Sequence, residues 1–307
     1  MHVFVTGGSG QTGPAVVSEL IAAGHHVTGL ARSDAAAAKL KALGAVPHRG
    51  SLDDPESLRR GAAAADGVVH MAFGGDFSDP EAMMRRDRTA IETLGRALEG
   101  SGKPLVSTSG TLVMPTGRLT TEQDEPDAAG AAAFRIPGER MCSSFAERGV
   151  RASVVRLAPT VHGPGDYGFI PMLIATARKT GVSAYIGDGA NRWPAVHRLD
   201  AAKLFRAALE QAPAGSMLHG VAESAITLRS IAEVIARGLG LPTASLTPDE
   251  AAVHFSSPAL ARFYGTDAPV SSSHTRELLG WVPTHPGLLA DIEHGDYLTA
   301  TPSIPFH

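Results

Sequence analysis

The sequence lacks the residues and patterns that build disulfides, metal clusters, membrane spans and strongly charged surfaces. Its 307 residues include one cysteine, Cys142, which excludes an internal disulfide and suits a reducing compartment. A net charge of −4 gives no electrostatic case for nucleic acid or an acidic membrane surface. No apolar run is long enough to cross a membrane, and the chain opens directly on an expected strand rather than a signal peptide. We therefore expect a cytoplasmic protein.

The histidines do not form a recognisable metal motif. All 13 are scattered along the chain, without the H-x-x-x-H or C-x-x-C spacing of zinc sites. We expect no metal centre. Hydrophobic residues make up 43% of the chain and charged residues 19%, as in a globular protein with a sizeable core.

Three glycines near the start of the chain carry its clearest functional signal. They follow an apolar run at 3–5 and precede apolar residues at helical spacing, so we expect a strand, a tight turn and a helix. The N-terminus of such a helix presents free N–H groups and a positive dipole end to a pyrophosphate. The alternative is a glycine turn without a ligand. We predict that this segment binds a dinucleotide through Gly7, Ser9, Gly10, Gln11, Thr12 and Gly13.

Strands and helices are expected to alternate through the first half of the chain, which predicts βαβ units and a parallel sheet. The fold class is α/β, a Rossmann-type doubly wound parallel sheet with a smaller discontinuous C-terminal substrate-binding cap. We assign 1–161 to the dinucleotide-binding domain, with 193–221 returning to it, and 162–192 and 222–307 to the cap. The expected strands of the sheet are 3–5, 26–30, 45–47, 68–72, 105–109, 152–156 and 217–221.

The end of the second expected strand indicates which dinucleotide is bound. It carries no Asp or Glu to accept hydrogen bonds from the adenosine ribose, but it does carry Arg32. An arginine can bind a 2′-phosphate through charge-assisted bonds, so we predict NADP; the alternative is an exposed loop arginine. The residues placed near adenine and its ribose are Ser51, Leu52, Met71, Ala72 and Phe73.

With these residues in hand, nearly the whole chain resembles the extended short-chain dehydrogenase/reductase superfamily. The segments that carry the resemblance are Thr6–Gly13, Val68–Ala72, Ser107–Ser109, Arg156–Asp166, Val196–Ala202 and Leu279–Pro283. The resemblance implies that Ser109 is the catalytic serine. It also implies that Ser107 and Pro159 contact the cofactor, Pro159 on its nicotinamide side.

The chain departs from this superfamily at the usual Tyr-x-x-x-Lys dyad, which the resemblance aligns with Arg135 and Glu139. Pro137 predicts a helix that starts near Ile136 and leaves Arg135 pointing into the cleft. Arg135 could bind a substrate carboxylate or stabilise an oxyanion, while Glu139 accepts hydrogen bonds from the nicotinamide ribose. The alternative is a salt bridge between these two residues, which lie four apart.

An arginine is a poor proton donor, so another group must supply a proton. The candidates are Ser109, relaying from water, and Tyr167, whose alternative role is a loop anchor. An imine or an enone would need no strong acid. We place Phe73, Thr111 and Trp193 at the substrate, with core packing as the alternative for Trp193.

These residues predict an NADPH-dependent oxidoreductase that transfers hydride to a small apolar carbonyl, enone or imine. One alternative is a redox-neutral epimerase, lyase or isomerase that keeps NADP bound. Another is a non-catalytic NADP-sensing regulator similar to NmrA-like proteins. A homodimer is possible through an apolar stripe in the helix expected at 80–99, although the sheet also needs this stripe. The stripe consists of Met83, Met84, Ile91, Leu94 and Leu98.

Overall fold

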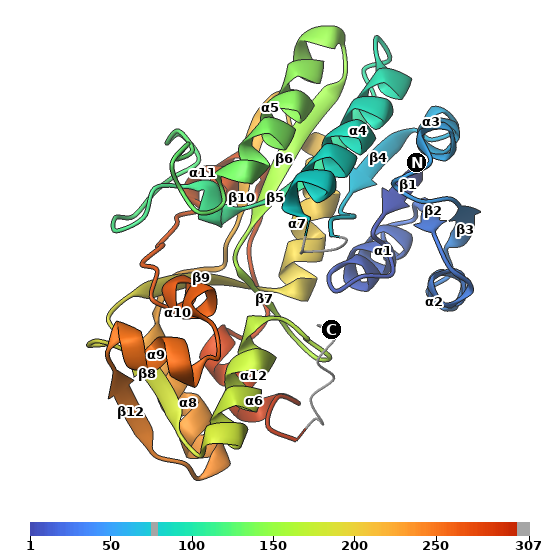
Figure 1. Ribbon diagram of the computed structural model, residues 1–307. Helices are drawn as coiled ribbons and strands as arrows, with labels where there is room; N and C mark the ends of the chain where they lie inside the picture. Colours follow the sequence, from blue (N-terminus) through green and yellow to red (C-terminus); the bar gives the residue numbers. More distant parts are fainter. Residues whose placement is uncertain (75–78, 300–307) are drawn as a thin grey trace.

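The central element of the protein is a seven-stranded parallel sheet, in a computed structural model that describes residues 1–74 and 79–299. Its spatial order is β10-β6-β5-β4-β1-β2-β3, so the direction of winding reverses between β1 and β4 (Figure 1). Such a switch point opens a crevice at the carboxyl ends of the strands. The strands are β1 (His2–Thr6), β2 (His26–Ala31), β3 (Val46–Arg49), β4 (Gly67–His70), β5 (Pro104–Gly110), β6 (Arg151–Leu157) and β10 (Ser216–Gly220).

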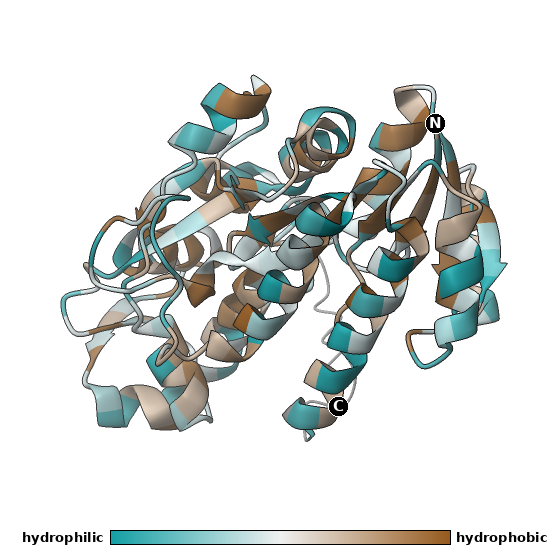
Figure 2. Cartoon of the chain, turned by 90° about the horizontal axis from the view of Figure 1, so that it is seen from above, coloured by the Kyte–Doolittle hydropathy of each residue, from teal (hydrophilic) through white to brown (hydrophobic). Residues whose placement is uncertain are grey.

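Helices cover both faces of this sheet, as the doubly wound prediction requires. One face packs against α1 (Gly13–Ala22), α2 (Asp34–Ala42) and α7 (Arg198–Gln211). The other packs against α3 (Pro55–Ala63), α4 (Pro80–Leu98) and α5 (Ile136–Ser144). Parts of the sheet are brown in Figure 2, and the inner strands β1, β4 and β5 are buried along most of their length.

The apolar stripe of α4 is used inside the molecule. All five of its members are buried, three of them in the core beneath α3, α4 and α5. The packing alternative for this stripe is therefore confirmed, and a homodimer stays a prediction. The stripe residues are Met83, Met84, Ile91, Leu94 and Leu98.

A second core forms the smaller part of the molecule, below the sheet in Figure 1. Its helices present apolar faces to one another and to two small sheets, ordered β11-β9-β7 and β12-β8. The strands are β7 (Thr160–His162), β8 (Ser183–Ile186), β9 (Arg192–His197), β11 (Glu223–Thr227) and β12 (Thr243–Leu246). The helices are α6 (Phe169–Thr180), α8 (Leu228–Leu239), α9 (Pro248–His254), α10 (Pro258–Tyr264) and α12 (Leu288–His294).

The two parts are joined differently from the expected division. β9 pairs with β7 and β11 instead of entering the main sheet, so the return to the sheet begins with α7. Conversely, Val270, Leu279 and Trp281, placed in the cap by the sequence, pack in the core of the main sheet, near α11 (Ser273–Leu279). Asp200 fixes this segment by accepting hydrogen bonds from the Thr284 and His285 backbone. None of the helices that the structure describes is both long and apolar enough to span a membrane.

Candidate active site

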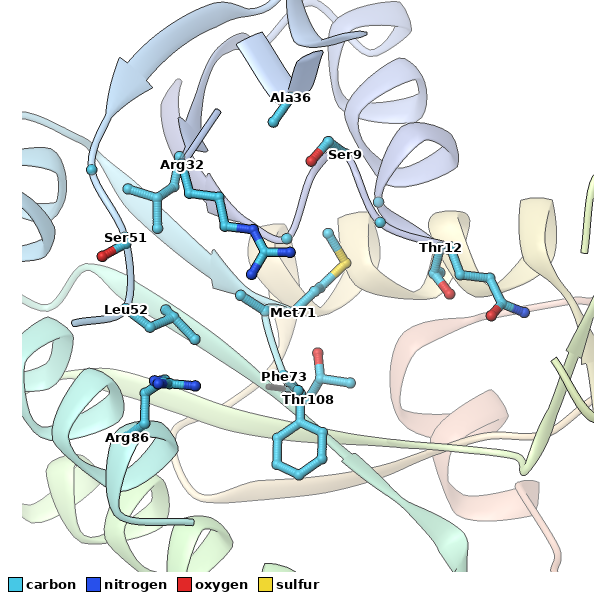
Figure 3. A pocket seen from close by; sticks show the side chains of 18 of the residues that line it. Ser9, Thr12, Arg32, Ala36, Ser51, Leu52, Met71, Phe73, Arg86 and Thr108 are labelled. Atoms are coloured by element: carbon cyan, nitrogen blue, oxygen red, sulfur yellow. The ribbon is translucent and has the colours of Figure 1, made fainter. Parts of the chain in front are cut away.

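A pocket of about 530 Å³ lies at the switch point of the sheet (Figure 3). Its walls are the glycine turn after β1, the end of β2, the loop after β3 and the end of β4. Twelve of the residues expected to contact the cofactor line this pocket. They are Gly7, Ser9, Gly10, Gln11, Thr12, Gly13, Arg32, Ser51, Leu52, Met71, Ala72 and Phe73.

The glycine turn has the shape that the sequence predicted. Gly7 has a φ of +76°, and a Cβ there would lie 2.6 Å from the Ala72 backbone nitrogen. A Cβ at Gly13 would lie 2.1 Å from the Gly7 carbonyl oxygen, so the start of α1 packs directly on the turn. At Gly10 the same atom would meet, among the described residues, that oxygen alone, at 3.3 Å. The turn therefore leaves open space at Gly10, and this cradle fits the pyrophosphate of a dinucleotide.

Charged side chains surround the end of the pocket beside β2. Arg32 is exposed, forms no ion pair with the residues the structure describes, and points its guanidinium into the pocket in Figure 3. Arg86 of α4 also lines this end, with its Nε 2.6 Å from Oδ1 of Asp53. The sequence analysis missed Asp53 and Arg86. Asp53 directly follows Leu52, whereas Arg86 reaches the pocket from a distant helix without a local signal.

Arg135 contacts two residues of the pocket wall, Phe73 and Thr108, without lining the pocket itself. The helix α5 begins at Ile136, as predicted from Pro137. The guanidinium carbon of Arg135 lies 3.6 Å from the centre of the Phe73 ring, and Nη2 donates to the Thr108 carbonyl oxygen at 2.7 Å. Burial lowers the pKa of Arg135, and the nearby carboxylates of Asp87 and Glu139 oppose this shift. Arg135 is thus a fixed, largely desolvated cation beside the pocket.

The role predicted for Glu139 is wrong. Both of its carboxylate oxygens accept hydrogen bonds from Arg156 of β6, with Nη2···Oε2 at 2.7 Å and Nε···Oε1 at 3.0 Å. Both residues are buried, and a buried carboxylate needs a charged partner that also satisfies its hydrogen bonds. Glu139 therefore faces the sheet. It does not form the alternative salt bridge with Arg135, and its oxygens are not free to accept hydrogen bonds from ribose hydroxyls.

Asp87 is a further acidic residue at this end that the sequence analysis missed. It is buried on α4, and its Oδ1 lies 3.4 Å from Nε2 of His70. His70 is held in turn by Thr6, with Nδ1 2.7 Å from the hydroxyl oxygen. The four charges of this region, on Asp87, Arg135, Glu139 and Arg156, balance one another. Asp87 is far from Arg135 in the sequence, so no local pattern pointed to it.

The remaining predicted residues divide between the pocket wall and the protein interior. Tyr167 lines the pocket, and burial raises the pKa of its hydroxyl. Ser109 and Thr111 are buried, with hydroxyl oxygens that find no partner among the described residues. The pocket wall contains Thr108 and Leu157 but not Ser107, Ser109, Thr111 or Pro159. Along β5, alternation of side chains turns Thr108 toward the pocket and Ser107 away from it.

Trp193 is not available to a substrate, so its predicted site role is wrong. Its side chain is fully buried in the second core, stacked on Tyr264 with ring centres 5.5 Å apart. Its indole N–H donates to the Thr266 carbonyl oxygen at 3.1 Å. An aromatic ring with its polar atom satisfied inside a core is a packing residue. Within residues 1–74 and 79–299, no group of three or more His, Cys, Asp or Glu is arranged to hold a metal ion.

A parallel sheet whose strand order reverses beside a glycine turn, with a pocket at that point, defines a Rossmann-type dinucleotide-binding protein. Comparison of the sequence with known families gives a narrower assignment. The chain belongs to the NAD dependent epimerase/dehydratase family, whose model matches residues 3–218. The extended short-chain dehydrogenase/reductase resemblance is thereby confirmed.

Individual relatives agree with this membership. An uncharacterised protein of Schizosaccharomyces pombe is 46% identical over 97% of this chain and 100% of its own length. A ketoreductase of Stigmatella aurantiaca acting on 4-hydroxy-2-methyl-3-oxo-4-farnesyl-3,4-dihydroquinoline-1-oxide is 29% identical over 78% of this chain and 74% of its own. The dTDP-glucose 4,6-dehydratase DesIV of Streptomyces venezuelae, solved with NAD, shares the fold. It has a TM-score of 0.78 and 19% identity over 97% of this chain and 96% of its own.

Proposed function

We propose that the protein is an NADPH-dependent oxidoreductase that transfers hydride to a small apolar carbonyl, enone or imine. The observation that carries the proposal is the half-buried Arg135 guanidinium, held against Phe73 and Thr108 of the pocket wall. The nicotinamide would supply the hydride. The protein then has to stabilise the negative charge that develops on the acceptor, and a preorganised cation does this best where water is scarce.

The balance of charge around Arg135 supports a neutral acceptor. Asp87 already offsets the charge of Arg135, and Arg156 offsets that of Glu139. A substrate carboxylate would add an unbalanced charge, whereas a carbonyl oxygen becomes negative only as hydride arrives. Arg135 keeps its proton, so the proton comes from water or from the Tyr167 hydroxyl on the pocket wall. An enone or imine reduces the demand for a strong acid.

Arg32 supports NADPH over NADH. It is exposed at the adenosine end of the pocket and forms no ion pair with the residues that the structure describes, so its guanidinium is available to a 2′-phosphate. The names of two relatives support reduction as the reaction, since one is a ketoreductase and another a 2-alkyl-3-oxoalkanoate reductase. A redox-neutral epimerase with bound NADP is the second candidate. The hydrogen bond from Gln11 of the glycine turn to Asp166 of the cap loop favours it, because this bond would help to keep the cofactor in the pocket.

The test is oxidation of NADPH by the purified protein against a panel of ketones, enones and imines. In Arg135→Ala we expect kcat to fall about 10²- to 10³-fold, as for loss of an oxyanion-stabilising donor. The Kd for NADPH should stay within a few fold. Arg140→Ala, at an exposed arginine on the helix α5 that directly follows Arg135, is the matched control and should leave both values unchanged.

The same experiment separates the other candidates. Binding of NADPH without oxidation by any acceptor would overturn the reductase proposal and favour a sensor. Release of NADP+ from freshly denatured protein, together with no net oxidation, would favour the redox-neutral reaction.

A further inference from the structure

The glycine turn is fastened to a loop of the second core. The side-chain amide of Gln11 donates to Oδ1 of Asp166 at 2.6 Å and to the carbonyl oxygen of Val161 at 3.3 Å. Gln11 lines the dinucleotide pocket, and so does Tyr167, the neighbour of Asp166. The hydrogen bond between Gln11 and Asp166 therefore connects the expected pyrophosphate site to the loop 163–168 of the cap, which contributes Tyr167 to the pocket wall.

The chain near its C-terminus holds this loop from the other side. The hydroxyl of Tyr297 donates to Oδ2 of Asp166 at 2.7 Å and accepts from the Gly163 backbone N–H at 3.1 Å. Asp296 accepts from the Gly165 N–H at 2.9 Å. Two adjacent residues thus bind the loop at three positions, Gly163, Gly165 and Asp166.

The hydrogen bonds around Asp166 form a partly buried and fully paired network, unlike an incidental contact at the surface. Tyr297 is only 6% exposed, and both oxygens of Asp166 are satisfied, Oδ1 by Gln11 and by the Gly168 N–H at 2.7 Å. Burial raises the pKa of Asp166, and the hydrogen bonds from Gly168 and Tyr297 oppose the shift. A buried polar group of this kind is costly unless its partners are kept together. The loop should therefore open only when these bonds break together.

We propose that Tyr297 is a positioning residue of the dinucleotide pocket. Acting through Asp166, it holds Gln11 and the loop that carries Tyr167 against the pocket and thereby limits the rate of cofactor release. This inference rests on the proposed function, since it requires that a dinucleotide occupies the pocket. Three segments far apart in the sequence meet at one carboxylate, so cofactor exchange is coupled to the C-terminal region.

The first test is the rate of NADPH release, measured by displacement with excess NADP+ in a stopped-flow fluorimeter. Tyr297→Phe removes only the hydroxyl, and loss of a hydrogen bond to a carboxylate predicts release that is about tenfold faster. Tyr185→Phe, a cap tyrosine stacked on Arg229 outside the pocket, is the matched control and should release NADPH at the wild-type rate.

A second variant keeps the test valid if Tyr297→Phe is poorly folded. Tyr297→Phe combined with Asp166→Asn leaves no unpaired buried carboxylate, so stability should recover while release stays fast. Hydrogen exchange without cofactor gives an independent readout. The Gly163 amide, which donates to the Tyr297 hydroxyl, should exchange faster in Tyr297→Phe and not in Tyr185→Phe.

Two results contradict different statements. If the wild-type protein binds neither NADPH nor NADH, the proposed function fails. If the wild type binds NADPH but Tyr297→Phe releases it at the wild-type rate, the inference about Tyr297 is overturned and the proposed function stands.

Discussion

The two ends of the dinucleotide pocket are built in different ways. At the β2 end, the walls are short continuous stretches in which backbone and glycines do most of the shaping, around Gly7 to Gly13 and Ser51 to Leu52. At the other end, near Phe73 and Thr108, charged side chains from α4, β6 and the start of α5 meet outside the pocket wall: Asp87, Arg135 and the Glu139–Arg156 pair. Apart from Arg86, the first end is formed by residues of short local stretches, whereas the second exists only once the sheet has assembled.

This difference predicts different consequences of substitution. A change in the glycine turn acts on the ligand, because the turn has its open side toward the pocket. A change in the buried ion pair acts on the whole fold, because removal of one partner leaves the other charge without compensation. The predictions below test whether the two ends separate in this way.

The largest effect should come from Glu139→Gln. The substitution leaves Arg156 charged and buried, and such a loss costs about 3 to 5 kcal/mol of the free energy of unfolding. Chemical denaturation measures it. The Kd for NADPH of the folded variant should change little, since both Glu139 oxygens face Arg156 and not the pocket. A large loss of cofactor affinity at unchanged stability would instead restore Glu139 as a ribose ligand.

The glycine turn should respond in two distinguishable ways. In Gly13→Ala, a Cβ 2.1 Å from the Gly7 oxygen forces the turn and α1 apart, at a cost of about 1 to 3 kcal/mol in stability, and NADPH binding is lost. In Gly10→Ala the nearest atom is 3.3 Å away, so stability should fall by less than about 1 kcal/mol while affinity still drops. Thermal denaturation and NADPH titration of both variants provide the comparison. Equal losses of stability would show that Gly10 is a packing residue.

The sequence predicted the glycine turn and the strand-end residues of the pocket, but not Asp53 or Arg86, for a physical reason. Gly7, Gly10 and Gly13 satisfy steric needs within one turn, and the residues that follow β2, β3 and β4 reach the same edge of a parallel sheet. The second end was not predictable in this way. Glu139 pairs with Arg156 because the register of β6 against β5 places that arginine beside it. Asp87 lies on α4, and the residues that it faces are decided only when α4 packs against its neighbours.

Arg32→Ala tests the β2 end with a moderate effect. Loss of charge-assisted bonds to a 2′-phosphate costs about 1.5 to 3 kcal/mol, so the Kd for NADPH should rise roughly ten- to a hundredfold. Binding of NADH should change much less. Arg49→Ala is the matched control, since Arg49 is exposed and paired with Asp34 near the same strands, outside the pocket wall. An equal loss of affinity for both cofactors would show that Arg32 does not read the 2′-phosphate.

The smallest effect should arise outside both ends, at His197, which caps the start of α7. Burial, and next the neighbouring His162, lower its pKa from 6.5 to about 4. The unfolded chain therefore binds more protons than the folded protein between these values, and stability falls as the pH drops from about 6.5 toward 4. His197→Asn preserves a side-chain cap for the Leu199 N–H and removes the titration.

We expect the stability advantage of the wild type over His197→Asn to shrink by about 1 kcal/mol between pH 7 and pH 4, allowing for partial exposure to solvent. Urea denaturation across this range measures the difference. NADPH affinity should follow the same pH dependence in both proteins, because His197 is absent from the pocket wall. A stability difference that stays constant with pH would mean that His197 titrates alike in the folded and unfolded chains.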